Sequence, residues 1–371
     1  MRLAFVYDRI NKFGGAERVL LALHEIWPDA PLYTAIYDRK KTAWANVFKI
    51  YPSLLSYLPD LLKKDKLLPL LTPLAFESLN LDNYDIVLSI TSAEAKAVIT
   101  KPATLHVCYC LTPTRYLWSG YDDYLIEPGA GLFNPLVRVL MRFFFTKLRI
   151  IDFISSTRAD FYLAISDNVA ARITKYYKRE SAVLYPPVEL AKFKPGSKNA
   201  SDDYFLIVSR LVPYKKVDYA ICAFNKLGWK LNIIGSGIDE TRLKGIAKSN
   251  INFLGDLTDT ELACYYQNCK ALIFPGEEDF GLTSVEVQAC GKPVIAYRRG
   301  GAEETIIDGK TGLFYDNQSE KSLISALKNF SNFDYLPSDC ISNASRFSKL
   351  NFQQIMIKTI ENYWIAHQRK I

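Results

Sequence analysis

The segment FPGEEDFGLTSVEVQACG (274–291) passes from an apolar run through an acidic loop into a helical stretch. The apolar run predicts a buried strand, and Gly281 precedes Thr283 and Ser284, which we expect to cap a helix that extends to Cys290. A glycine before a helix exposes backbone N–H groups at the positive end of the helix dipole, which suits a phosphate group. This segment therefore indicates an α/β fold with an anion site at the end of a strand.

Two glutamates flank this turn. Glu278 lies before it, and Glu286 lies eight residues later on the expected helix. Both carboxylates could face one ligand and accept hydrogen bonds from its hydroxyl groups. The alternative is that Glu286 complements the helix dipole and that Glu278 is solvated.

A basic turn, SRLVPYKK (209–216), follows the apolar run FLIV (205–208). Arg210 would lie at the C-terminal end of a strand, where open parallel sheets bind their ligands, and Lys215 follows across a proline-containing turn. One guanidinium and one ammonium group there could neutralise a diphosphate without a metal ion. The alternative is a solvated basic turn, which is the usual fate of such charges.

The order of strand, loop and helix recurs along the chain. Short apolar runs that we expect to be strands are 3–7, 85–90, 105–110, 161–165, 205–208, 231–234, 251–254, 271–274, 294–296 and 312–315. Stretches expected to be helical are 16–26, 91–99, 166–177 with Ser166 as its cap, 218–225 and 350–368. Short strands without alternation, bounded by helices, predict parallel sheets that are covered on both faces.

The best domain boundary lies where the double proline of LYPPV (184–188) is followed by the polar stretch PGSKNASDD (195–203). We expect an N-terminal Rossmann-like domain at 1–187 and a second Rossmann-like domain at 188–350. A C-terminal helix at 351–371 is expected to cross back to the first domain. Ligands are then expected in a cleft between the two domains.

The composition excludes several classes of protein. The 371 residues include 46 Lys+Arg and 39 Asp+Glu, and the net charge of +7 is too weak for a dedicated nucleic-acid binder but fits anionic ligands or lipids. Seven Cys without CxxC spacing and three His predict reduced thiols rather than a disulfide frame or a zinc site. The N-terminal apolar run is short for a secretory signal, and no run approaches about 18–20 apolar residues. We expect a cytoplasmic protein that is soluble or bound to a membrane surface.

Glycines near the ends of expected strands offer further places where a ligand could approach the backbone. These glycines are Gly14 and Gly15, Gly235 and Gly237, and Gly300 and Gly301. Each could equally be part of a tight turn. A dinucleotide fingerprint is excluded because Glu240 occupies the place of its last glycine, and a P-loop ending in GKT (309–311) is excluded because Glu304 occupies the place of its first glycine.

Several of these motifs occur together in a known family. They are Arg210-x4-Lys215, Glu278-x7-Glu286, QACGKPVIAYRRGGAEET (288–305), GGAERVL (14–20), YCLTPTRYLW (109–118) and TGLFY (311–315). In this combination the chain resembles the family 4 glycosyltransferases, retaining enzymes with the GT-B fold of two Rossmann-like domains whose parallel sheets face a central cleft. The resemblance covers most of the chain and is most specific from 205 to 315. The EEDFG form (277–281) and HVCYCLTPTRYLW (106–118) are similar to bacterial mannosyltransferases of exopolysaccharide and O-antigen assembly.

The resemblance implies a role for each matching residue. Arg210 and Lys215 would bind the diphosphate of a nucleotide-sugar donor and, with Glu278 on the sugar hydroxyls, would form the catalytic set. Glu286 would bind the ribose. Further donor contacts are implied for Gly14, Gly15, Gly235, Gly237, Phe280, Gly281, Leu282 and Thr283. The resemblance implies no metal ion and no cofactor besides the donor itself.

The chain departs from the family at one position. Relatives commonly have a His that touches the donor sugar where this chain has Leu111. His106 lies in the expected strand LHVCYC and is interpreted as a packed core residue rather than a substitute. Thr112 and Arg115 remain near the edge of the expected cleft and could contact the sugar or the acceptor.

A basic and aromatic stretch indicates a membrane surface. Between Glu127 and Asp152 there is no acidic residue, and Arg138, Arg142, Lys147 and Arg149 alternate with Leu, Met and Phe. Such a helix can lie in an anionic lipid interface, and the stretch 51–72 repeats the combination. The alternative is a core helix whose long basic side chains reach outward to water.

The leading hypothesis is a retaining hexosyltransferase that moves mannose from GDP-mannose to a polyprenyl-linked or oligosaccharide acceptor in cell-surface polysaccharide synthesis. A UDP-hexose donor stays open because the sequence has no clear base discriminator. A noncatalytic nucleotide-sugar-binding scaffold also stays open, because Leu111 replaces the expected His. An epimerase of the same architecture is disfavoured because its proton chemistry needs more ionisable groups than the expected cleft offers.

Overall fold

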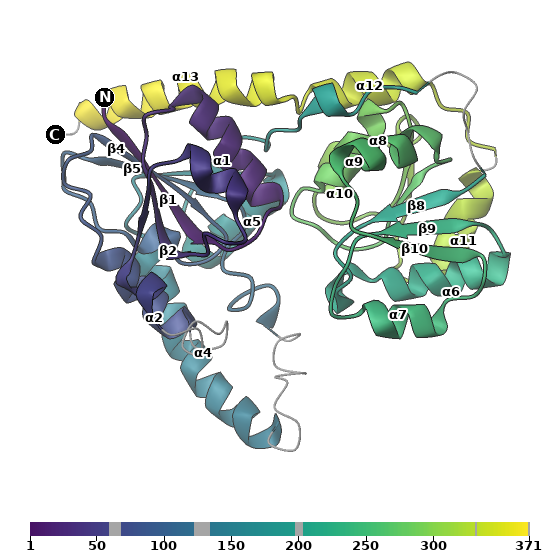
Figure 1. Ribbon diagram of the computed structural model, residues 1–371, viewed down its shortest axis with the longest axis horizontal. Coiled ribbons are helices and arrows are strands. Elements are labelled where there is room, and N and C mark those ends of the chain that lie inside the picture. The colour runs from purple at the N-terminus through teal and green to yellow at the C-terminus, as the bar shows by residue number, and fades with distance from the viewer. Residues whose placement is uncertain (59–67, 122–133, 197–202, 331, 370–371) are drawn as a thin grey trace. The chain divides into compact units, whose positions relative to one another are not determined.

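The chain forms two α/β units (Figure 1). The computed structural model describes residues 1–58, 68–121, 134–196, 203–330 and 332–369, and for 68–70 and 134–143 it describes the backbone alone. The N-terminal unit comprises Met1–Tyr185 and Gln353–Ile371, and the C-terminal unit comprises Pro186–Phe352. Among the described residues, no helix has the length and apolar character needed to cross a bilayer.

The N-terminal unit is built on a seven-stranded sheet with the order β3-β2-β1-β4-β5-β6-β7. Its strands are β1 Leu3–Ile10, β2 Leu32–Tyr37, β3 Ile50–Pro52, β4 Ile86–Thr91, β5 Leu105–Cys110, β6 Phe161–Ala164 and β7 Ala182–Val183. Its helices are α1 Gly15–Ile26, α2 Leu68–Glu77, α4 Asn134–Ser156 and α5 Asp167–Tyr177, with short 3-10 helices η1 Ala43–Val47, η2 Leu54–Tyr57 and η3 Ala95–Ala97. All of its strand pairs are parallel.

The C-terminal unit is built on a six-stranded parallel sheet with the order β10-β9-β8-β11-β12-β13. Its strands are β8 Phe205–Val208, β9 Leu231–Ile234, β10 Ile251–Gly255, β11 Leu272–Phe274, β12 Val294–Tyr297 and β13 Gly312–Tyr315. Its helices are α6 Val217–Leu227, α7 Glu240–Ile246, α8 Asp259–Asn268, α9 Leu282–Ala289, α10 Ala302–Thr305, α11 Glu320–Phe330 and α12 Pro337–Ser345, with 3-10 helices η5 Leu190–Lys192 and η6 Pro213–Lys215. Two parallel sheets flanked by helices confirm the predicted α/β class.

The last helix, α13 Lys349–Gln368, begins in the C-terminal unit and continues into the N-terminal unit. In the N-terminal unit, the Gln353 amide donates to the Ala22 carbonyl at 3.1 Å, and the ring of Tyr363 stacks on Phe161 at 4.1 Å between centroids. The final helix is thus a structural part of the first sheet's unit.

Both sheets reverse their strand order beside their first strand. From β1 the chain continues to β2 and β3 on one side, and β4 then pairs with the other side of β1. From β8 it continues to β9 and β10, and β11 then pairs with the other side of β8. The loops at the carboxyl ends of two such strands diverge and leave room for a ligand, so each unit has one switch point where a site is expected.

Strand β1 extends beyond the predicted run 3–7 to Ile10. Asp8 is buried within it, and its carboxylate accepts hydrogen bonds from Thr91 Oγ1 at 2.7 Å and from the backbone N–H groups of Ser92 at 2.7 Å and Ala95 at 2.8 Å. A buried carboxylate with three donors is compensated, so a charged residue does not end the strand.

The same contacts explain why the helix predicted at 91–99 is absent. The segment contains only the short 3-10 helix η3, because the amides of Ser92 and Ala95 are bound to Asp8 rather than to a helical ladder. The predicted cap of the helix after β6 is confirmed, since the Ser166 hydroxyl accepts from the Val169 N–H at 3.1 Å.

Candidate functional site

The switch point of the C-terminal unit brings together two of the predicted site residues. Lys215, in the loop after β8, and Glu278, in the loop after β11, form an ion pair with 2.5 Å between Nζ and Oε1. Their side chains are 11% and 22% exposed, so the pair lies near the surface without being fully solvated. A partly desolvated pair at the carboxyl edge of a parallel sheet is a suitable place for a charged ligand.

Glycines allow the loops to approach this closely. A Cβ on Gly276 would lie 2.9 Å from the carbonyl oxygen of Lys215, and one on Gly301 would lie 2.3 Å from the backbone of Phe280. The Gly301 N–H also donates to the Glu278 carbonyl at 2.8 Å, which fixes the backbone of the acidic loop. Any larger residue at these two positions would push the loops apart.

Arg210 lies at the same edge, two residues beyond the end of β8, and its side chain is exposed. Its Nη2 donates a 2.7 Å hydrogen bond to the hydroxyl of Tyr214, whose ring lies 5.4 Å from Lys215 Nζ. Tyr214 was not among the predicted site residues. The sequence signal that could have identified it is an aromatic residue between the two cations of the Arg210-x4-Lys215 motif.

The loops after β8 and β9 pack against each other through the predicted glycines. A Cβ on Gly235 would lie 2.1 Å from the Ser209 carbonyl oxygen, and one on Gly237 would lie 2.1 Å from that of Leu211. Gly235 also has a positive φ of 120°. Close packing of the chain on itself accounts for both glycines, and their contact with a donor stays a prediction.

Helix α9 begins at least two residues earlier than predicted, because the predicted caps Thr283 and Ser284 would put its first residue at 284 or 285. Gly281, with φ of 93°, is its N-cap and Leu282 its first residue, so Thr283 and Ser284 lie inside the helix and do not cap it. The Ser284 hydroxyl instead donates to the Gly281 carbonyl at 2.8 Å. Gly281 is required here because a Cβ would lie 2.7 Å from the ring of Phe274.

The side chains around this helix divide between surface and core. Leu282 and Thr283 are half-buried, whereas Phe280 is buried and packs edge-on against Phe347 with 5.3 Å between ring centroids. Only the backbone of Phe280 can therefore approach a ligand without a rearrangement of the core.

Glu286 is a buried carboxylate on α9. It is 3% exposed, and its Oε2 accepts a 2.9 Å hydrogen bond from the hydroxyl of the fully buried Tyr266. A buried carboxylate needs such donors to offset the loss of hydration. The contact of Glu286 with a ribose stays a prediction.

The predicted glycines of the N-terminal unit lie at the start of α1. Gly14 is the N-cap of the helix in an extended conformation, and Gly15 is its first residue. The neighbouring Glu17 is buried and accepts a 2.6 Å hydrogen bond from the hydroxyl of Tyr7. Their approach to a donor stays a prediction.

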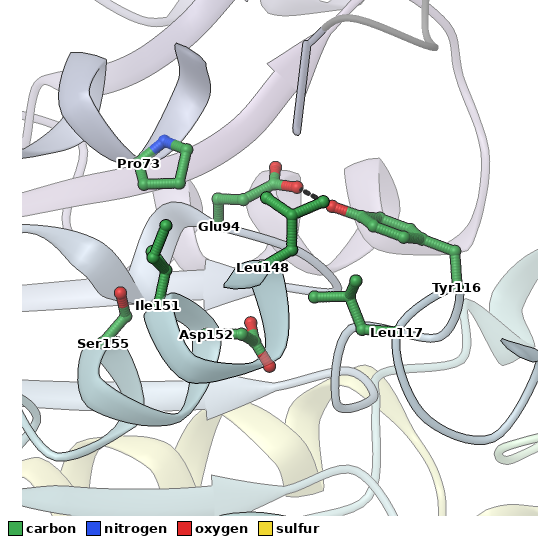
Figure 2. Close-up of a pocket in the computed structure, with 8 residues that line it drawn as sticks. All are labelled: Pro73, Glu94, Tyr116, Leu117, Leu148, Ile151, Asp152 and Ser155. Carbon is green, nitrogen blue, oxygen red and sulfur yellow. Dashed lines mark hydrogen bonds between the residues drawn. The ribbon is translucent and has the colours of Figure 1, made fainter. Parts of the chain in front are cut away.

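The switch point of the N-terminal unit also has an ion pair. Arg9 Nη2 of β1 lies 3.2 Å from Glu94 Oε2 in the loop after β4, with exposed fractions of 19% and 6%. The other oxygen of Glu94 accepts a hydrogen bond from the hydroxyl of Tyr116 (Figure 2). Burial raises the pKa of Glu94, and the Arg9 guanidinium opposes that shift.

A small pocket beside this pair lies between the loop with Tyr116 and helices α2 and α4 (Figure 2). Half of the residues that line it are aliphatic, and the buried hydroxyl of Ser155 makes no hydrogen bond with the described residues. The residues that line it are Pro73, Glu94, Tyr116, Leu117, Leu148, Ile151, Asp152 and Ser155.

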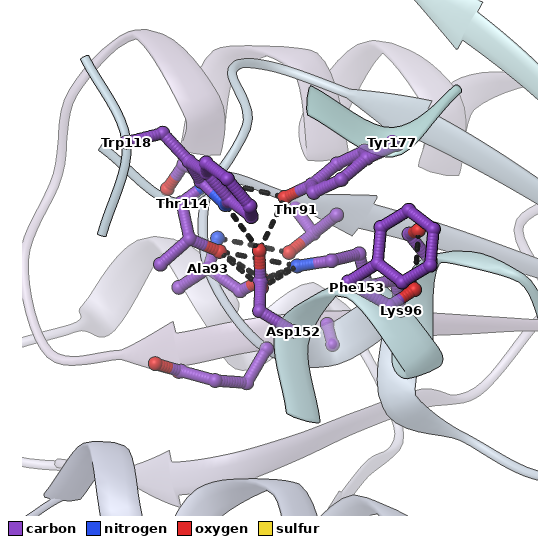
Figure 3. Close-up of polar contacts among 12 residues, drawn as sticks. Thr91, Ala93, Lys96, Thr114, Trp118, Asp152, Phe153 and Tyr177 are labelled. Carbon is purple, nitrogen blue, oxygen red and sulfur yellow. Dashed lines mark hydrogen bonds and ion pairs between the residues drawn. The ribbon is translucent and has the colours of Figure 1, made fainter. Parts of the chain in front are cut away.

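A largely buried polar network is centred on Asp152, one of the residues that line the pocket (Figure 3). Asp152 accepts hydrogen bonds from Lys96 Nζ at 2.6 Å, Thr114 Oγ1 at 2.7 Å, Trp118 Nε1 at 2.7 Å and the Tyr177 hydroxyl at 2.9 Å. Burial alone would lower the pKa of Lys96, but the Asp152 carboxylate raises it above its ordinary value. Sequence patterns missed this network, since its members come from four separate segments.

Of the three residues near the predicted sugar contact, Leu111 and Thr112 are buried. Leu111, which stands where the family has His, follows β5 and is 9% exposed. The Thr112 hydroxyl is buried and has no hydrogen-bond partner among the described residues, and Arg115 is half-exposed. His106 packs inside as interpreted, with Nε2 2.9 Å from the Ser89 hydroxyl, and burial lowers its pKa to about 4.

The predicted membrane residues lie on α4. The side chains of Arg138 and Arg142 lie outside the described residues, and Lys147 is exposed. Arg149 interacts within the unit, where its Nε donates to the Leu117 carbonyl at 2.6 Å and its guanidinium lies 4.0 Å from the centre of the Tyr121 ring.

Helices α4 and α2, which contact each other, expose apolar side chains on the described part of their surface. Phe144, Ile151 and Ile154 share one face of α4 with Lys147 at helical spacing. We call this surface the α2–α4 face; its exposed apolar members are Leu71, Leu74, Phe144, Ile150, Ile151 and Ile154.

None of the seven cysteines is in a disulfide. Five are buried, Cys222 is partly exposed and Cys264 is exposed. Burial raises the pKa of Cys108, Cys269 and Cys290 to about 12, so these thiols are held in the protonated form at neutral pH. Within the described ranges no three His, Cys, Asp or Glu side chains are grouped as metal ligands.

Comparison with known proteins gives a consistent result. Residues 189–347 match the family model described as glycosyl transferases group 1. The chain is 30% identical over 201 residues to an uncharacterized glycosyltransferase of Methanocaldococcus jannaschii, covering 53% of this chain and 56% of the relative. The chain thus spans about half the length, or less, of the curated relatives that it matches.

Solved structures match over nearly the whole chain. The Anabaena protein HepE in complex with UDP-glucose has a TM-score of 0.69 at 18% identity, covering 98% of this chain and 100% of that chain. The apo form of the lipopolysaccharide outer core galactosyltransferase WaaB has a TM-score of 0.68 at 18% identity, covering 98% and 99%. Residues 189–347 thus match the glycosyl transferases group 1 family, and the chain as a whole has the GT-B fold.

Proposed function

We propose that the chain is a retaining glycosyltransferase that moves a hexosyl group from a nucleoside diphosphate sugar to an acceptor hydroxyl. The observation that carries this proposal is the Lys215–Glu278 pair at the β8–β11 switch point, with Arg210 at the same edge. The two cations, Arg210 and Lys215, suit a diphosphate, and the Glu278 carboxylate suits sugar hydroxyls. One edge of the sheet therefore offers groups for both halves of such a donor.

In the proposed reaction, the bond between the anomeric carbon and the diphosphate oxygen breaks, and the acceptor oxygen forms the new bond on the same face. Negative charge develops on the departing diphosphate, and Arg210 and Lys215 stabilise it where it develops. The proton of the acceptor hydroxyl goes to the departing phosphate. Arg210 and Lys215 thus provide the charge stabilisation that a metal ion supplies in other enzymes, so we expect activity to persist in EDTA.

The first proposed donor is GDP-mannose, on the motifs EEDFG (277–281) and HVCYCLTPTRYLW (106–118). A UDP-hexose is the second candidate, and the complex of the structurally similar HepE with UDP-glucose favours it. The acceptor that we propose is a polyprenyl-linked or oligosaccharide chain of a cell-surface polysaccharide.

The donor is tested by thermal unfolding with GDP-mannose, UDP-glucose and ADP-glucose, because a ligand that binds the native state raises its melting temperature. A shift with one of them and hydrolysis or transfer of its sugar support the enzyme. A shift without any turnover would favour the noncatalytic scaffold. No shift with any of the three would contradict the proposal.

We also propose that the protein binds the cytoplasmic face of a membrane through the α2–α4 face. Support comes from its exposed aliphatic and aromatic side chains beside Lys147, and from a stretch at 128–151 that has basic residues and no acidic ones. Apolar side chains enter the lipid interface, and each nearby cation adds about 1 kcal/mol on anionic lipid. An acceptor with a polyprenyl anchor would be presented at such a surface.

Flotation with vesicles of phosphatidylcholine, with and without phosphatidylglycerol, tests this attachment. We expect the protein to float with the anionic vesicles at low salt, and the double variant Ile150→Asp/Ile154→Asp to stay in solution. The control is Ile238→Asp, which changes an even more exposed isoleucine of the C-terminal unit and is expected to float like the unmodified protein. No flotation of the unmodified protein would contradict the proposal.

A further inference from the structure

Tyr214 contacts both cations of the switch-point loop. Its hydroxyl accepts the 2.7 Å hydrogen bond from Arg210 Nη2, and its ring centre lies 5.4 Å from Lys215 Nζ, within the range of a cation–π contact. One half-buried side chain therefore links the two residues to which the proposed function assigns the diphosphate.

The backbone around Tyr214 is fixed on both sides. Pro213 begins the 3-10 helix η6, and the Lys215 N–H donates to the Val212 carbonyl at 3.0 Å. Leu211, just before this turn, is fully buried. The tyrosine is thus presented from a rigid turn that is anchored in the core at Leu211.

Arg210, in contrast, is exposed and has a long side chain that would otherwise sample many rotamers. Fixing such a side chain costs conformational entropy, which a ligand would have to offset on binding. The bond to Tyr214 takes one of the five guanidinium N–H donors and leaves the rest of the planar group for an anion.

We infer that Tyr214 is a positioning residue that holds Arg210 and Lys215 in the arrangement that binds the diphosphate. The inference rests on the proposed function, and it assigns to Tyr214 no contact with the reacting atoms. Its hydroxyl acts through Arg210, and its ring acts through Lys215.

The test is calorimetric titration of UDP and GDP into the full chain. The nucleotide that binds is then titrated into the variants. Tyr214→Phe removes a hydrogen bond that positions Arg210 without touching the ligand, so we expect it to raise the Kd by about 3–10-fold, and loss of the guanidinium predicts about 10–100-fold for Arg210→Ala. If the hydroxyl acts through Arg210, the double variant has the Kd of Arg210→Ala, because the two effects are not additive. The nucleoside monophosphate should lose less affinity than the diphosphate in Tyr214→Phe.

Tyr204→Phe is the matched control. Tyr204 lies just before β8 and away from the basic turn, and its hydroxyl donates to the Tyr265 carbonyl at 2.9 Å. We expect it to leave the Kd unchanged. Additive effects of Tyr214→Phe and Arg210→Ala, or an unchanged Kd in Tyr214→Phe, would overturn the inference while leaving the proposed function intact. If neither nucleotide binds the unmodified protein, the proposed function itself fails, and the inference fails with it.

Discussion

The two sheets reverse strand order at equivalent places, but the ion pairs at these places differ in how completely they are satisfied. At the β1–β4 switch point, one oxygen of Glu94 faces Arg9 and the other accepts from the Tyr116 hydroxyl. At the β8–β11 switch point, Lys215 faces one oxygen of Glu278, and the exposed Arg210 is bound to a neutral tyrosine hydroxyl. The first carboxylate has its partners within the protein, whereas the second site keeps charge for a ligand.

The surroundings make the difference larger. Beside the first switch point lies the buried Lys96–Asp152 pair, in which the carboxylate has four donors. A carboxylate with that many partners stabilises the packing of its own unit and has little capacity for a ligand. The same topology thus gives a structural network in one unit and a candidate anion site in the other.

The largest expected effect is on stability in the N-terminal unit. Asp152→Ala leaves the ammonium group of Lys96 buried and unpaired, so we expect a loss of about 3–5 kcal/mol in the free energy of unfolding. Urea unfolding followed by circular dichroism measures it. Lys192→Ala, which breaks the exposed pair with Asp259, is the control and should cost less than about 1 kcal/mol. Equal losses in the two variants would show that the buried network is not structural.

The next effect is on turnover in the C-terminal unit. Lys215→Met removes a charge that stabilises the leaving diphosphate, so we expect kcat to fall by about 10²–10³-fold. Steady-state transfer of a radiolabelled sugar from the donor identified by thermal unfolding measures it. The melting temperature should change little, because the pair is near the surface. Unchanged kcat would remove Lys215 from the mechanism.

A third effect depends on pH and belongs to the buried His106. Its pKa of about 4 in the folded protein lies below the ordinary value of about 6.5, so the unfolded chain takes up a proton first as the pH falls. The stabilising contribution is complete above pH 6.5 and decreases, by at most about 3 kcal/mol, as the pH falls to 4.

Because the raised pKa of Glu94 acts in the opposite direction, the quantity to compare is the difference in unfolding free energy between the unmodified protein and His106→Gln. That difference should decrease from pH 7 to pH 4 and stay constant above pH 7. A flat difference across this range would mean that His106 is not held neutral.

The smallest expected effect is on diphosphate binding at the β8–β11 switch point. Glu278→Gln removes the carboxylate that competes for Lys215, so we expect the nucleoside diphosphate to bind a few-fold more tightly while sugar transfer decreases. Glu277→Gln removes the same charge one residue away and should have a smaller effect on binding. Calorimetry measures both, and weaker diphosphate binding in Glu278→Gln would contradict this role of the pair.

The fold class was predictable because the apolar runs and the helical stretches between them follow the βα pattern closely. The end of β1 could not be predicted, because Asp8 is tolerated within the strand only through hydrogen-bond donors that lie 83–87 residues away in the sequence. The N-cap of α9 at Gly281 was not predictable either, because it depends on close contact with Phe274, which no local pattern encodes.

The candidate site was partly predictable. The Arg210, Lys215 and Glu278 motifs pointed to one sheet edge because parallel strands bring their carboxyl ends together. Tyr214 was missed because its role depends on side-chain direction. The network around Asp152 was missed because its members come from four segments, and Asp152 and Lys96 alone are 56 residues apart in the sequence.

We expect the β8–β11 switch point to bind the diphosphate and the β1–β4 switch point not to bind it. The direct measurement is the Kd of UDP or GDP for Lys215→Met and Arg9→Met, taken at a temperature where circular dichroism shows both to be folded. We expect Lys215→Met to lose affinity by about tenfold or more, as for the loss of a bond to a charged group, and Arg9→Met to change it by less than about twofold. Equal losses of affinity in the two variants, or a loss only in Arg9→Met, would contradict the placement of the diphosphate at the β8–β11 switch point.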